Sequence, residues 1–246
     1  MSGNNSTQIL LTTHTPALAG LLPLDGLRYV ESTNGVRTVE SGNDTVYEKI
    51  SNALGVLPDP ISKNATAIML VEGKSDVTFI NHTANELKGG GYINETFEEK
   101  NIAIVPIGGC GNLKHWRLLK LAEQFQIPYC VLLDSDKGTN EEQKNIDAIN
   151  AIKAQGVKAY LTRKREPENY ILNSVLGLPA GNEPTYTDTC DAKVIIAHAT
   201  TTRKQNVIEN FWTDMNCAQI RQAEHYQEGG QDKYEFTEMF NDLLII

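Results

Sequence analysis

Short apolar runs alternate with longer segments of helical periodicity in the middle of the chain. Four runs have the unbroken aliphatic character of strands buried on both faces: Ala67–Val71, Ile102–Ile107, Tyr129–Leu133 and Val157–Leu161. After the runs, apolar residues recur every three or four positions, which predicts helices that begin near Ser75, after the glycine run 108–111, near Asn140 and near Glu168. Four successive strand–helix units predict an α/β fold with a mainly parallel sheet flanked by helices.

The residues before this region predict a smaller, separate part. Gln8–Thr12 has the pattern of a strand, and Asp44–Leu54 has that of a helix. Between them, Gly26–Glu31 and Val36–Glu40 flank an Asn-Gly pair, which is a strong hairpin signal. Two prolines close the segment, so we predict one domain over residues 1–60 and the α/β domain over residues 65–183.

The residues after Pro184 predict a small helical appendage, residues 184–246. Four segments have helical periodicity: Ala192–Ala199, Val207–Trp212, Ala218–Tyr226 and Tyr234–Leu244.

Carboxylates follow the first and third strands of the α/β region. Glu72 and Asp76 come after the first strand, and Asp134 and Asp136 come after the third. Ligand sites of parallel sheets lie at the carboxyl ends of the strands, so we expect these side chains to share one crevice. Two carboxylates about 4 Å apart repel by roughly 4 kcal/mol at an effective dielectric constant near 20, and a divalent cation relieves that repulsion. The alternatives are a solvated turn at residues 134–136 and an Asp76 that only favours the positive end of its helix.

A mixed-charge segment follows the fourth strand. Here Glu166 and Glu168 can complete a second metal site while Lys164 faces a scissile phosphate and Arg163 and Arg165 hold flanking phosphates. The alternative is an ordinary surface helix start, with Glu168 near the positive end of the helix.

A glycine-rich loop follows the second strand. Gly109 and Gly111 match two glycines of a dinucleotide-binding loop, but Lys114 stands where the third would be. Backbone N–H groups of this loop, together with Lys114, can hold a DNA phosphate instead; a plain tight turn is the other interpretation.

Composition narrows the class of protein. The 246 residues are 40% hydrophobic and 22% charged, as in ordinary globular proteins, and no apolar stretch approaches the roughly 20 residues that span a bilayer. The four cysteines have no C-x-x-C spacing, which argues against structural zinc and a disulfide framework, so we expect a cytoplasmic protein without membrane contact. A net charge of −9 disfavours nucleic-acid binding by simple attraction, although metal ions and a local basic patch can still supply it.

The segments Leu70–Asp76 and Leu133–Asp136 together resemble a Toprim domain, the metal-binding fold of topoisomerases, primases and certain nucleases. The further segment Lys164–Tyr170 is similar to the OLD (overcoming lysogenisation defect) nuclease family, which includes the Gabija A relative of phage defence. The resemblance covers roughly residues 65–180 and implies a Toprim (Rossmann-like) sheet.

In that family an ABC-type ATPase precedes the Toprim domain. The segment Gln8–Pro16 resembles the last ATPase strand, with His14 as its phosphate-sensing residue, but no phosphate-binding loop, signature motif or Walker B strand precedes it. We therefore expect residues 1–60 to be the remnant of an ATPase and the chain to be the carboxyl-terminal portion of a longer protein.

The resemblance implies a metal-dependent DNA endonuclease that works with two Mg²⁺ or Mn²⁺ ions, in phage defence. Glu72, Asp134 and Asp136 would hold one ion, and Asp76, Glu166 and Glu168 would contribute to the other. Glu72 would also be the general base, and Lys164 would stabilise charge on the phosphate. Gly138 stands at the third position of the fuller Toprim acidic series, so the glutamate that completes the second site stays open.

Two other functions fit the same residues. Asp134, Asp136 and Thr139 resemble the nucleophile loop of haloacid dehalogenase phosphatases, although that class carries the motif on its first strand. A non-catalytic metal-binding interaction module is the other candidate. The partners implied by the resemblance are DNA and the missing ATPase portion, while a homo-oligomer and a helicase or other defence-system partner stay open.

Overall fold

A computed structural model describes residue 12 and residues 26–33, 36–41, 65–107 and 128–246. The chain divides into two compact units, Met1–Pro60 and Ile61–Ile246. In the first unit, strands β1 (Arg28–Thr33) and β2 (Val36–Ser41) form the predicted antiparallel hairpin, with Val30 opposite Val39. The strand expected at residues 8–12, the helix at 44–54 and His14 fall mainly or wholly outside the described residues.

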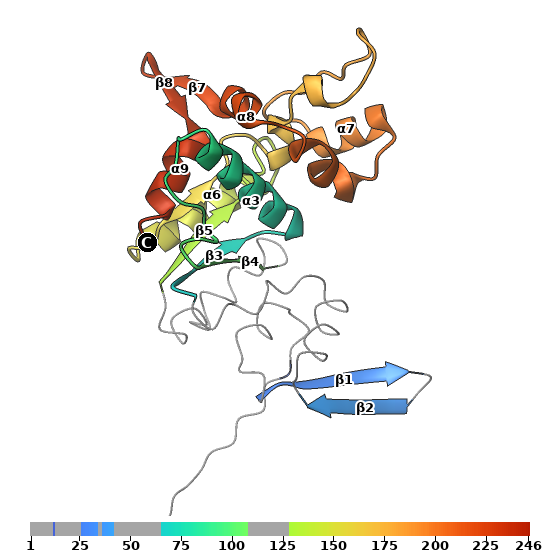
Figure 1. Ribbon diagram of the computed structural model, residues 1–246, viewed down its shortest axis with the longest axis vertical. Helices are drawn as coiled ribbons and strands as arrows, with labels where there is room; N and C mark the ends of the chain where they lie inside the picture. Colours follow the sequence, from blue (N-terminus) through green and yellow to red (C-terminus); the bar gives the residue numbers. More distant parts are fainter. Residues whose placement is uncertain (1–11, 13–25, 34–35, 42–64, 108–127) are drawn as a thin grey trace, which may run out of the picture. The chain divides into compact units, whose positions relative to one another are not determined.

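The second unit is built on a four-stranded parallel sheet, as predicted (Figure 1). Its strands, in spatial order, are β4 (Ile102–Pro106), β3 (Ala67–Val71), β5 (Tyr129–Leu133) and β6 (Ala159–Leu161). Strands β3 and β5 are adjacent and parallel, and both are almost fully buried. Because they run in the same direction, their carboxyl ends lie at one edge of the sheet.

Side chains of the strands alternate between two covered faces. Met69 of β3 and Leu132 of β5 belong to one hydrophobic cluster with helix α3 (Lys74–Gly89). Ile68 and Val131 point to the opposite face, where helix α6 (Glu142–Lys153) packs against β6. Helices on both faces explain why the strands are continuous apolar runs.

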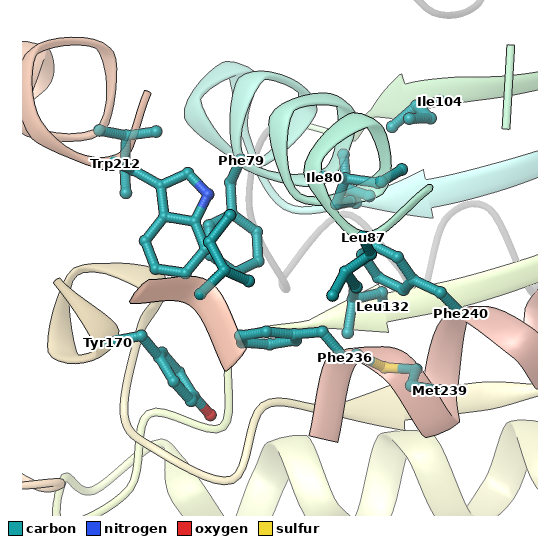
Figure 2. Packing of buried hydrophobic residues seen from close by; sticks show 14 of the residues in the cluster. Phe79, Ile80, Leu87, Ile104, Leu132, Tyr170, Trp212, Phe236, Met239 and Phe240 are labelled. Carbon is teal, nitrogen blue, oxygen red and sulfur yellow. The ribbon is translucent and has the colours of Figure 1, made fainter. Parts of the chain in front are cut away.

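The carboxyl-terminal elements share the core of the sheet. Helices α7 (Ala192–Thr200), α8 (Cys217–Glu224) and α9 (Glu235–Leu243) and the π-helical turn η5 (Ile208–Trp212) follow the predicted helical segments. Figure 2 shows Phe79 of α3 packed between Trp212 of η5 and Phe236 of α9, with ring centroids 4.5 and 5.0 Å from that of Phe79. Buried Trp212 also donates a hydrogen bond from its Nε1 to Thr83 Oγ1 at 3.0 Å. Among the described helices, none is long and apolar enough to cross a membrane.

Two sequence predictions differ from the structure. The helix predicted over 168–176 is instead two short 3₁₀ turns, η2 (Pro167–Tyr170) and η3 (Asn173–Val175), because Ile171 and Leu172 between them are extended. A third 3₁₀ turn, η4, is Lys204–Asn206. The helix predicted over 218–226 ends at Glu224 and leads into a hairpin of β7 (His225–Glu228) and β8 (Gln231–Tyr234). Gly229 and Gly230 have φ of 59° and 78°, the conformation that a tight hairpin turn requires.

Candidate metal centre

Five carboxylates come together at the carboxyl edge of the sheet. Glu72 follows β3, and Asp134 follows the neighbouring strand β5. Asp76 lies in the first turn of α3, where its Oδ2 accepts a hydrogen bond from the backbone N–H of Gly73 at 2.7 Å. Glu166 and Glu168 lie at the start of η2, after β6. Three separate strand–helix connections therefore supply the acids.

Electrostatics show that these acids share one neighbourhood. Burial raises the pKa of Asp134 well above its ordinary value, and the charges of Asp76, Glu72, Glu168 and Glu166 raise it further. Each added negative charge makes ionisation of Asp134 less favourable. Clustering of this kind is common at functional sites and is relieved by a bound cation.

Two other carboxyl groups in the cluster hold their protons to unusually high pH. Burial raises the pKa of Asp76 to about 6, against hydrogen bonds from Gly73 and Glu72 N–H and the charge of Lys193 that lower it. Burial also raises the pKa of Glu168 to about 7; Lys193 lowers it and Glu166 raises it. Both carboxyls therefore titrate between mildly acidic and neutral pH.

Lys193, which the sequence analysis did not single out, is the cation that contacts this cluster. Its Nζ lies 3.1 Å from Glu168 Oε1 and 3.6 Å from Glu166 Oε2, and its backbone N–H donates to Glu166 Oε1 at 3.2 Å. Burial alone would lower the pKa of Lys193, but Glu168 and Glu166 outweigh that effect and raise it. The available signal was a lysine in the first turn of a mainly apolar helix, α7.

Asp136 is oriented differently from the other predicted ligands. Its backbone is left-handed, with φ of 49°, and its Oδ2 accepts a hydrogen bond from Asn145 Nδ2 of α6 at 3.0 Å. The same amide nitrogen lies 3.2 Å from the carbonyl oxygen of Asp134. Asn145 thus ties the loop after β5 to α6, and the Asp136 carboxylate is held toward that helix.

The predicted phosphate-binding cations contact other acids. Arg163 pairs with Asp188 at 2.8 Å, and Arg165 lies 3.6 Å from Asp191. Lys164 Nζ donates to the carbonyl oxygen of Asn169 at 3.1 Å and lies 3.7 Å from Asp188. Burial lowers the pKa of Lys164, although Asp188 opposes the shift. The other predicted phosphate ligands, Gly109, Gly111 and Lys114, lie outside the described residues.

The donor set fits a divalent cation in chemistry and charge. Carboxylate oxygens are the ligands that Mg²⁺ and Mn²⁺ prefer. Of the five acids, Glu166 and Glu168 have ion-pair contacts with the ammonium of Lys193. Glu168 Oε2 is buried without a hydrogen-bond partner among the described residues. Over those same residues, no three His, Cys, Asp or Glu side chains are arranged so that they hold one ion. Side-chain rotation is therefore needed to bring the oxygens onto a common point.

Comparison with known families identifies the domain. Residues 65–136 match a family model described as "Overcoming lysogenization defect protein-like, TOPRIM domain". This segment is thus similar to the Toprim domain of OLD-like proteins. A search of curated proteins found no match for the chain. Toprim domains typically bind divalent metals and occur in metal-dependent proteins that act on nucleic acid, so the match suggests a function of this kind.

The matched segment includes only part of the candidate centre. Glu72, Asp76, Asp134 and Asp136 lie within the Toprim match, whereas Glu166, Glu168 and Lys193 lie beyond it. The structure brings the acids of both parts to the same edge of the sheet, because β6 pairs with β5 and delivers η2 beside it.

Proposed function

We propose that the protein is a metal-dependent DNA endonuclease that hydrolyses phosphodiester bonds with two Mg²⁺ or Mn²⁺ ions. The observation that carries the proposal is the convergence of four carboxylates around Asp134, at the carboxyl edge of a sheet that resembles an OLD-like Toprim domain. When bound, the ions would activate the attacking water and stabilise the leaving oxygen.

The acidic residues of the cluster would bind the two ions in two groups. Glu72 and Asp134 would hold the first ion, joined by Asp136 after its carboxylate turns away from Asn145. Asp76, Glu166 and Glu168 would contribute to the second, and their common proximity to Lys193 supports that grouping. Glu72 would accept the proton of the attacking water at its carboxylate.

The basic residues after β6 would orient the DNA backbone. Arg163 and Arg165 would hold phosphates that flank the scissile one, and Lys164 would stabilise charge on the scissile phosphate itself. A phosphate-binding role for Gly109, Gly111 and Lys114 stays a prediction.

The biological setting is also part of the proposal. Phage defence, in the cytoplasm, is the setting that the likeness to OLD nucleases supports. The same likeness suggests an ATPase portion of a longer protein as a partner of this domain.

Plasmid cleavage tests the activity. The wild-type protein should nick or linearise supercoiled plasmid with Mg²⁺ or Mn²⁺ and leave it intact with chelator. Glu72→Gln and Asp134→Asn should each abolish cleavage, because each removes a metal-binding charge. Glu183→Gln is the matched control, since Glu183 is exposed and accepts a hydrogen bond only from nearby Gly181 among the contacts described. Undiminished cleavage by Asp134→Asn would contradict the proposal.

A non-catalytic metal-binding module is the second candidate. The observation that favours it is that the cations predicted to bind phosphate, Arg163, Lys164 and Arg165, contact the carboxylates of Asp188 and Asp191. Metal binding without cleavage of supercoiled, linear or single-stranded DNA would support this alternative.

A further inference from the structure

Two short segments of the second unit carry opposite charges in matching order. Residues 163–168 present three cations followed by two acids, and residues 188–193 present two acids followed by a lysine. We call residues 188–193 the counter-charge segment. Its charged side chains contact the cations and acids that the proposed function assigns to DNA and metal.

The acids of the counter-charge segment face the predicted phosphate-binding cations. Asp188 Oδ2 lies 2.8 Å from Arg163 Nη1, and its Oδ1 lies 3.7 Å from Lys164 Nζ. Asp191 Oδ2 lies 3.6 Å from Arg165 Nη2. A carboxylate and a phosphate are both oxygen anions that guanidinium groups bind, so these carboxylates and a DNA backbone compete for the same donors.

The lysine of the segment faces the predicted second metal site. Lys193 Nζ lies 3.1 Å from Glu168 and 3.6 Å from Glu166. Glu168 is almost fully buried, at 1% exposure, so a charge at this position needs a cation beside it. An ammonium group and a divalent ion compete for the same carboxylates.

The backbone of the segment is anchored in part by hydrogen bonds that do not involve these charged side chains. The N–H of Arg165 donates to the carbonyl oxygen of Asp188 at 2.8 Å, and Asn169 Nδ2 donates to the carbonyl oxygens of Thr187 and Cys190 at 2.7 and 3.0 Å. The side chains can therefore exchange partners while the chain stays in place.

We propose that Asp188, Asp191 and Lys193 are an autoinhibitory set of internal counter-charges, which DNA phosphates and a divalent cation must displace. This inference rests on the proposed nuclease function and adds a regulation of the same site. Its consequence is that neutralising the set strengthens binding of both ligands. A segment with only a structural role would leave binding unchanged or weaken it.

The DNA arm uses the double variant Asp188→Asn/Asp191→Asn in the full chain. Asn keeps an oxygen for Arg163 and caps helices as well as Asp, so α7 should keep its cap on Val194 N–H. Fluorescence anisotropy of a labelled DNA duplex, measured in chelator so that nothing is cleaved, should show affinity higher by on the order of tenfold, because two repelling charges are gone. The control Glu209→Gln/Asp214→Asn removes two exposed acids elsewhere and should change affinity far less.

The metal arm uses Lys193→Gln. Calorimetric titration with Mn²⁺ in the absence of DNA should show the weaker site tightened by roughly tenfold, the scale of effects from side chains that neighbour metal ligands. Lys204→Gln removes an exposed lysine of η4 and is the matched control, expected to leave Mn²⁺ binding unchanged.

The outcomes separate this inference from the proposed function. Equal or weaker DNA binding by the double variant, or equal or weaker Mn²⁺ binding by Lys193→Gln, overturns the inference while the wild type still binds both ligands. Failure of every variant and of the wild type to bind Mn²⁺ overturns the proposed function and the inference with it. Circular dichroism checks the fold, and Asp188→Asn alone, which leaves the cap of α7 untouched, replaces the double variant if that does not fold.

Discussion

The aromatic core beneath α3 and the acidic edge of the same sheet differ in how they use burial. In the core, Phe79, Trp212 and Phe236 pack edge to face or tilted, and the one indole N–H has a hydrogen-bond partner. At the edge, five carboxylates lie close together, Lys193 contacts two of them, and burial raises the pKa of three of them. Exclusion of water therefore stabilises the aromatic core but raises the free energy of the acidic edge. This is expected where the residues of the edge are selected for binding a ligand and not for stability.

Removal of an aromatic side chain from the core should change the free energy of unfolding more than any change at the acidic edge. Trp212→Ala should lower the free energy of unfolding by about 3–5 kcal/mol, because it leaves a cavity and removes the hydrogen bond that Trp212 donates to Thr83 Oγ1. Urea denaturation measures the loss. Half-buried Phe211, the neighbouring aromatic, is the control, and Phe211→Ala should cost clearly less. Equal losses at the two positions would contradict the assignment of the core.

Neutralisation of the edge should have a smaller effect of opposite sign. Asp134→Asn should raise the free energy of unfolding by about 1–2 kcal/mol in chelator at pH 8, since it removes a buried carboxyl group that four neighbouring acids repel, and it should abolish Mn²⁺ binding. Urea denaturation and calorimetric titration measure the two effects. The control is Asp147→Asn, which removes an exposed carboxylate away from the cluster that accepts a hydrogen bond from Gln143. A loss of stability in Asp134→Asn would show that this charge stabilises the fold.

The smallest of the three expected effects is the change in stability with pH that the acidic edge produces. The pKa values of Asp76 and Glu168 rise from 3.8 and 4.5 to about 6 and about 7, so the folded state binds more protons than the unfolded state between these limits. Stability in chelator should therefore fall as pH rises from about 4 to about 7. Each kcal/mol lost lowers Tm by roughly 2–4 °C. Thermal unfolding with saturating Mg²⁺ should show a shallower fall, and identical curves with and without Mg²⁺ would argue against metal binding by these acids.

The parallel sheet was predictable because buried strands leave a clear mark on the sequence. The runs at Ala67–Val71 and Tyr129–Leu133 match the strands at both ends, and apolar residues at helical spacing predicted α3 and α6. The hairpin of β7 and β8 was missed because its strands are mostly polar and exposed, although Gly229-Gly230 is a recognisable turn signal.

The acidic cluster was predictable in part. Glu72 and Asp134 stand directly after buried parallel strands, so their position at the carboxyl edge of the sheet could be predicted from the topology. Lys193 was not predictable in the same way, because it lies far along the chain from its partners and meets them only through tertiary packing of α7 against η2. The orientation of Asp136 depends on Asn145, a contact that no local pattern encodes.

Glycine 138 sets how closely two segments approach. It has φ of 81°, and a methyl group in place of its hydrogen would lie 2.9 Å from the Cβ of Thr189, within the counter-charge segment. One additional carbon atom would therefore push the loop after β5 away from the counter-charge segment. A side chain at position 138 would therefore both strain the left-handed backbone of the loop and push the two segments apart, although every charge in the centre would be retained.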